Sequence, residues 1–129
     1  MNPVPEDVKD MILDSSSGLS YTLGIDLFLF SLPETPDELV CILETTGYEP
    51  EGYDLFYPGL QILVRGKNGD YATPYSAATS IFNFIRSKKN TTVGTTKYLS
   101  FIATSDILSL GEDYQGRYSF SMNFLVTRG

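Results

Sequence analysis

Two stretches of the chain repeat apolar residues at the spacing of one helical face. The first stretch places them at i, i+4, i+7 and i+8: Val4, Val8, Met11 and Ile12. It predicts a short helix over residues 5–14, with acidic residues in the first turn, where they favour a helix N-terminus. A second, broader stripe covers residues 75–85, and Thr73-Pro74 before it is typical of a capping residue followed by a first helical proline. We therefore expect a second helix over residues 74–88.

Five other segments combine strand-forming residues with the length of a β-strand: residues 26–31, 39–44, 60–65, 98–104 and 117–127. The last segment alternates apolar and polar residues most regularly. Its apolar residues should therefore share one buried face: Tyr118, Phe120, Met122, Phe124 and Val126. The serine, asparagine and threonine residues between them should face water or a neighbouring protein.

The segments between these runs have the composition of turns and loops. Residues 33–37 hold two prolines and two acidic residues, which predicts a turn and an antiparallel or loose pairing of its flanking strands. Glycine, proline and polar residues make 47–59 a predicted loop and 90–94 a predicted turn. Residues 108–116 are predicted to form a polar hairpin loop, so that the last two strands pair antiparallel.

These elements and the chain length define the expected fold. A chain of 129 residues suits one domain, because a single hydrophobic core typically serves about 100–150 residues. The predicted order is α-β-β-β-α-β-β. We expect an α+β fold in one domain over residues 1–129, with two helices packed on a mostly antiparallel sheet of four to five strands.

Aromatic residues in the predicted 47–59 loop change this picture. An aromatic side chain exposed to water contributes no stabilisation by burial, whereas a loop held against another surface could bury about 150 Å² or more per aromatic side chain. Two interpretations remain open: the rings contact another subunit, or they cover the core beneath their own loop. We expect a protein interface at this loop and at the 108–116 loop, with these residues: Tyr48, Tyr53, Phe56, Tyr57, Glu112, Asp113 and Tyr114.

The charge balance limits the possible partners. The chain carries 16 acidic and 9 basic residues, a net charge of −7, which disfavours direct nucleic-acid binding. The acidity serves either solubility alone or a functional acidic surface, and the basic run at 86–89 fits a helix C-terminus better than a nucleic-acid site. No apolar run approaches membrane-spanning length, and the N-terminus lacks signal-peptide character, so we expect cytosolic synthesis and no membrane association.

Residues suited to catalysis are scarce. The chain has no histidine, the usual general base near neutral pH and the commonest metal ligand. Its one cysteine, Cys41, lies in an apolar run and is expected to be a buried small hydrophobic residue. The carboxylate pairs lie in loops or a first helical turn and do not match a calcium-binding loop. We therefore expect no catalytic residue, cofactor or metal; the alternative of another class is a small enzyme or ligand-binding module with a tyrosine and carboxylate cleft, for which Asp70, Tyr71 and Tyr75 are candidates.

Two segments carry a family resemblance: residues 57–66 (YPGLQILVRG) and 116–128 (GRYSFSMNFLVTR). Together they resemble the bacteriophage minor capsid and tail-terminator proteins. The surrounding layout is similar to that family as well, with an N-terminal helix and a strand that ends in a Leu-Pro turn at residues 32–34. A Pro-Gly-Leu-Gln strand then leads into a helix with tyrosine and alanine at 71–84. The resemblance covers nearly the whole chain, through short and mostly structural motifs.

The resemblance implies a structural virion protein rather than an enzyme. Such proteins form a ring, usually of six copies, that caps the tail tube of a long-tailed phage and joins it to the head connector. The implied partners are further copies of the chain, the tail tube protein and a head-completion or connector protein. DNA would pass through the lumen without specific binding, and acidic residues there would repel it. The implied location is the virion neck, after assembly in the host cytoplasm. The alternative is a head-completion or tail-tube protein on a similar fold.

Overall fold

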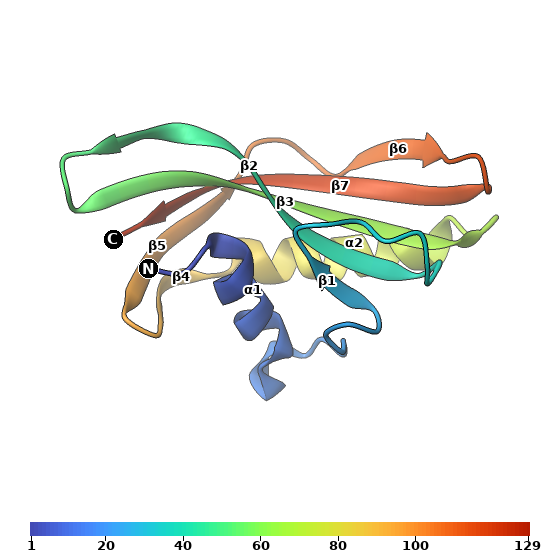
Figure 1. Cartoon of the computed structure of the whole chain (residues 1–129), viewed down its shortest axis with the longest axis horizontal. Coiled ribbons are helices and arrows are strands. Elements are labelled where there is room, and N and C mark those ends of the chain that lie inside the picture. Colours follow the sequence, from blue (N-terminus) through green and yellow to red (C-terminus); the bar gives the residue numbers. More distant parts are fainter.

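The apolar stripes of the two predicted helices are the faces that pack on a sheet. The computed structural model describes all of residues 1–129, and both helices lie on the same side of the sheet (Figure 1). Helix α1 (Val4–Leu13) agrees with the prediction within one residue. Helix α2 (Ala72–Arg86) begins two residues early, because the Asp70 carboxylate accepts a hydrogen bond from the Thr73 amide at 3.1 Å. Asp70, and not Thr73, is thus the capping side chain.

Seven strands form one sheet, in the order β1-β2-β3-β7-β5-β4, with β6 paired to β7 off this path. Their bounds are β1 (Leu27–Leu29), β2 (Leu39–Glu51), β3 (Leu55–Asn68), β4 (Lys89–Val93), β5 (Thr96–Ala103), β6 (Leu108–Glu112) and β7 (Arg117–Arg128). A short 3₁₀ turn, η1 (Ser15–Ser17), follows α1. The α+β class and the five predicted strand segments are confirmed. The expected number of strands, four to five, is wrong: the sheet has seven strands, and it is mixed because one of its strand pairs is parallel.

The mixed character comes from β1, which runs parallel to β2. The prolines and acids of residues 33–37 suggested a reversal, but the connection between β1 and β2 crosses over and returns the chain in the same direction. Such a short crossover is possible because β1 has only three residues, so the connection has to run back only a short distance to the start of β2. The side chain that holds this connection in place, Arg65, is distant in sequence.

Residues 47–59 form most of a long hairpin and not a loop. We call residues 43–60 the β2–β3 arm; it reaches beyond the helices (Figure 1). Gly47, the first residue of the predicted loop, lies inside β2, where a Cβ would come within 2.0 Å of the Tyr57 carbonyl oxygen. At Gly59 a Cβ would come within 2.6 Å of the Thr46 carbonyl oxygen. Both glycines therefore permit a close backbone approach at an irregular part of the ladder, which is the usual meaning of glycine within a strand.

The two strands of the sheet beyond the five predicted segments are β4 and β6. The predicted turn at 90–94 is mostly strand β4, whose threonines and valine pair with β5. In the predicted 108–116 loop, the first five residues form β6, and only 113–116 turn the chain. The expected antiparallel pairing of β5 with β7 is confirmed. Strand β6 lacked a signal because it lies at an edge with every residue exposed, so no buried face imposes alternation on it.

The main core fills the space between the sheet and the helices. Phe120, Met122, Phe124 and Val126 are buried there, as their alternation predicted, and Tyr118 is partly buried beside them. Cys41 is buried too, but it is in register with Leu63 and Ser121 on the opposite face, which carries no helix. Its thiol lies 2.9 Å from the Ser31 carbonyl oxygen, and burial raises the pKa of Cys41, as expected for an unreactive thiol.

A buried polar network joins the two ends of the chain. The Tyr98 hydroxyl donates to the carboxylate of Asp7 and accepts a hydrogen bond from Arg128 at 3.1 Å. The Arg128 guanidinium also donates to the Asn2 carbonyl, although its Nε is buried without a partner. Burial, together with the Asp7 hydrogen bond, raises the pKa of Tyr98, so the hydroxyl keeps its proton. Helix α1 is thereby attached to β5 and β7.

Replacing Tyr98 tests this network. Tyr98→Phe keeps the ring but leaves the buried Asp7 carboxylate without its closest donor, so the free energy of unfolding should fall by about 1–3 kcal/mol. Chemical denaturation measures this loss. Tyr118→Phe is the matched control, because its hydroxyl bonds to Glu112 at the surface and its loss should change stability by about 0.5 kcal/mol or less. Equal effects of the two substitutions would contradict the role of the network.

Candidate assembly surfaces

One arginine from each of the two sequence motifs contacts the connection between β1 and β2. Arg65 lies near the end of β3 and Arg117 begins β7, and their side chains are only 5% and 2% exposed. Register pairing places Arg65 opposite Ser119, on the face of the sheet without helices. Three segments far apart in sequence, the Leu-Pro turn and the two motifs, therefore meet at one place.

Arg65 holds the connection through its backbone. Its guanidinium donates four hydrogen bonds to carbonyl oxygens: Asp37 at 3.0 Å, Pro33 at 2.9 Å, Glu34 at 3.2 Å and Pro36 at 2.7 Å. The planar group with five donors suits this arrangement, whereas a lysine could satisfy fewer of the oxygens. One side chain thus satisfies four of the five backbone carbonyl oxygens of residues 33–37.

Arg117 joins the same connection to the turn at 113–116. It donates to Asp113 at 2.8 Å, to the Glu34 carbonyl at 2.7 Å and to the Asp37 carboxylate at 3.1 Å. Asp113 in turn accepts the backbone amides of Gln115 and Arg117, which closes the turn. We call Arg65, Arg117 and the residues they bind at 33–37 and 113 the arginine cluster.

Electrostatics in the arginine cluster balance two buried cations against three carboxylates. Burial lowers the pKa of Arg65, and the positive charge of Arg117 lowers it further. Hydrogen bonds from Arg117, first from its backbone amide and then from its side chain, hold the pKa of Asp113 below its ordinary value. The carboxylates of Glu34, Asp37 and Asp113 each lie within 3.4 Å of Arg117, so the buried charge is paired.

The three residues expected at an interface near this turn have different environments. Asp113 is partly buried and its carboxylate is occupied by Arg117. Glu112 is exposed and accepts the Tyr118 hydroxyl at 2.7 Å. Tyr114 is 85% exposed, and only its hydroxyl is bound, to Glu34. Of the three, Tyr114 presents the most apolar surface to a partner.

The β2–β3 arm separates its four aromatic residues into two pairs. Tyr48 is 72% exposed and Tyr53, at the tip, is 97% exposed. Phe56 and Tyr57 are half-buried, and the Tyr57 hydroxyl donates to Glu51 at 2.7 Å. Phe56 and Tyr57 are thus partly covered within the chain, whereas Tyr48 and Tyr53 are mostly exposed, so contact with another subunit stays a prediction for these two residues.

Further exposed apolar residues lie where the sequence suggested only a polar loop. Leu108 and Leu110 of β6 and Ile102 of β5 are each more than half exposed. Register pairing places Leu108 beside Ser121 and Ile102 beside Leu125, so they lie on the face without helices. The predicted loop holds two leucines, but nothing in the sequence indicated that they line a sheet edge.

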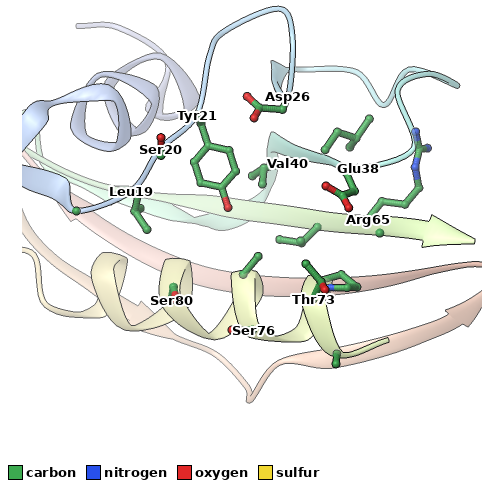
Figure 2. Close-up of a pocket in the computed structure, with 17 residues that line it drawn as sticks. Leu19, Ser20, Tyr21, Asp26, Glu38, Val40, Arg65, Thr73, Ser76 and Ser80 are labelled. Carbon is green, nitrogen blue, oxygen red and sulfur yellow. The ribbon is translucent and has the colours of Figure 1, made fainter. Parts of the chain in front are cut away.

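A cleft of about 680 Å³ opens between α2 and the segment before β1 (Figure 2). The Tyr21 ring extends from that segment toward α2, where Ser76 and Ser80 lie (Figure 2). Burial raises the pKa of Tyr21. Glu38 and Arg65 close one end, and the Arg65 guanidinium is already occupied by carbonyl groups. The lining offers hydroxyl groups and small apolar side chains, but it contains no nucleophile paired with a base.

The residues proposed for a ligand-binding alternative do not line this cleft. Asp70 caps α2, as described above. Tyr71 and Tyr75 stack at 6.2 Å between ring centroids, and both lie edge-on to Phe120, at 5.1 and 5.5 Å. The three residues form a helix start and an aromatic cluster, and no group of three or more His, Cys, Asp or Glu side chains is placed to hold a metal ion.

The fold and these surfaces together define a class of protein. It is a small α+β subunit with a projecting hairpin and exposed apolar edges, features suited to assembly with other chains. The family model described as "Bacteriophage tail terminator protein" matches residues 10–128. The chain therefore belongs to this family of phage tail terminator proteins, and it is a component of the virion. None of its helices has the length and apolar character needed to cross a membrane.

A solved structure supports the fold. A chain of the structure described as "Virion of native gene transfer agent (GTA) particle" superposes with a TM-score of 0.72. The superposition covers 98% of this chain and 95% of that chain, at 11% sequence identity. At that identity the likeness shows a shared fold alone. No curated protein sequence matches the chain.

Substitution of Arg65 tests the arginine cluster. Arg65→Lys keeps the charge but loses part of the set of hydrogen bonds, so the free energy of unfolding should fall by about 1–3 kcal/mol. Amide hydrogen exchange should rise at residues 33–38. Arg86→Lys is the matched control, because it makes the same change at an exposed arginine. Unchanged exchange at 33–38 in Arg65→Lys would show that the connection does not depend on this side chain.

Asp113 should make the cluster sensitive to acid. Its pKa is depressed in the folded protein, so its stabilising effect is present above the unfolded aspartate pKa of about 3.9 and is lost as the pH falls through the folded value. The stability difference between the parent chain and Asp113→Asn should therefore be constant near neutral pH and shrink toward zero below the folded pKa. Urea denaturation over a pH series measures it; a difference that does not change with pH would refute the ion pair.

Proposed function

We propose that the chain forms a ring, of six copies, that ends the tail tube of a long-tailed phage and joins the tail to the head. The observation that carries this proposal is the family match over residues 10–128, nearly the whole chain. Residues 1–129 act in this role as one domain. No catalytic step is part of the proposal, because the chain acts by its shape and by the surfaces it presents.

The distribution of exposed surfaces supports a ring. In a cyclic ring each copy offers two different patches, one to each neighbour. The arm, with Tyr48 and Tyr53, pairs with the C-terminal end of β7. The turn that contains Tyr114 lies at the N-terminal end of β7. The two surfaces are thus separate, as a contact between unlike patches requires.

The partners follow from the position at the tail end. One side of the ring would contact the tail tube protein, and the other a head-completion or connector protein. DNA would pass through the lumen without specific binding. The excess of acidic residues, 16 against 9 basic, is compatible with a passage that does not retain DNA.

Removal of the protein tests termination directly. Phage particles made without it should have tails of variable, excessive length that do not join heads, and supplying the parent chain should restore uniform tails. Electron microscopy of the particles measures both length and attachment. Other outcomes would overturn the proposal in a defined way: no tails would indicate a tube subunit, and unattached tails of normal length would indicate a head-completion protein.

A further inference from the structure

The β2–β3 arm is strongly acidic and has an open edge. Residues 43–60 contain four acidic residues and no basic one: Glu44, Glu49, Glu51 and Asp54. All four are exposed, next to Tyr48 and Tyr53. The pairing of β1 with β2 ends at Ile42, so the outer edge of β2 has no partner strand along the arm. The outer backbone edge of β2, the side chains of Tyr48 and Tyr53 and the carboxylates are therefore available to another chain.

A cleft of about 540 Å³ between α2 and the end of β5 has the opposite character. Its apolar part is formed by Phe82, Phe101 and Ile102, and its basic part by Arg86 and Lys89. The pairing of β4 with β5 stops at Ser100, so β4 leaves the following residues of β5 without a partner on that side. The cleft therefore lies at a second open edge of the sheet.

The cations at this cleft are free of ion pairs. Arg86 lies over the ring of Phe82 at 5.1 Å, and neither Arg86 nor Lys89 makes a salt bridge. Asp106 is the one carboxylate that lines the cleft. In a chain of net charge −7, this is a local excess of positive charge beside apolar surface.

From these two complementary features, we propose that the acidic arm of one copy docks in the basic cleft of the next copy, through Tyr53 and its neighbouring carboxylates. This inference rests on the proposed ring and names its subunit contact. An unlike-patch contact of this kind leaves a free arm at one end of a row of copies and a free cleft at the other end until the ring closes. The aromatic tip would bury against Phe82 and, at the open edge of β5, against Ile102, while opposite charges set the orientation.

A second copy fits the cleft better than the other possible occupants. DNA would meet few cations and the field of an acidic chain. The arm matches in charge and apolar character, and it has the same stoichiometry as the cleft because both belong to one chain. It also extends beyond the helices of its own copy, so it is free to reach a neighbour (Figure 1).

Disulfide cross-linking between copies tests the contact. A Tyr53→Cys chain is mixed with a tagged Ile102→Cys chain at high concentration and oxidised, and the mixed dimer is quantified by mass. Its yield should exceed several-fold the yield from Tyr53→Cys with Ile25→Cys, which places a cysteine at an exposed site outside the cleft. Cys41 is buried and stays in all chains. Equal yields from the two mixtures would overturn the proposal.

Charge reversal separates this contact from the ring itself. Glu49→Lys/Asp54→Lys and Arg86→Glu/Lys89→Glu should each reduce ring formation on purified tube ends by several-fold, and all four changes in one chain should restore it. Thermal unfolding confirms that each variant folds, and Lys67→Glu, an exposed cation outside the cleft, is the control. If the parent chain forms rings and neither charge reversal reduces ring formation, the arm contact is refuted but the proposed ring is not. Absence of parent rings would refute the proposed function.

Discussion

Two buried guanidinium groups hold in place the connection that lies on the face of the sheet without helices. The helices shield one face, but the other has only the connection between β1 and β2, and that connection has little apolar content with which to hold itself in place. Arg65 and Arg117 supply the missing interactions by binding its carbonyl and carboxylate oxygens. The parallel placement of β1, the burial of Cys41 and the position of the 113–116 turn all follow from this arrangement.

Periodicity was a good guide wherever one face of an element is buried. The two helices, the alternation of β7 and the burial of Cys41 were predictable, because packing against a core imposes a repeat that the sequence must show. Strands β4 and β6 and the arm have no buried face to impose one, so their exposed residues have the composition of loops. Gly47 illustrates the ambiguity, since the same residue can end a strand or permit two backbones to cross.

The candidate surfaces were less predictable for a related reason. Exposed tyrosines could be identified from the sequence, but only the structure separates Tyr48 and Tyr53, which are uncovered, from Phe56 and Tyr57, which are not. Asp113 was expected at an interface and is instead bound by Arg117, four residues away. The motifs that carry the family resemblance contain both arginines, yet the role of these residues depends on a loop some 30 or more positions earlier, and no local pattern reveals it.

The network of Tyr98, Asp7 and Arg128 has a practical consequence for the ends of the chain. Arg128 bonds to Asn2, and the amino and carboxyl termini lie near one another beside the arm (Figure 1). A short peptide linker could therefore connect Gly129 to Met1 with little distortion, and new termini could be opened in an exposed turn elsewhere. Affinity tags on such circular permutants could be placed away from the arm.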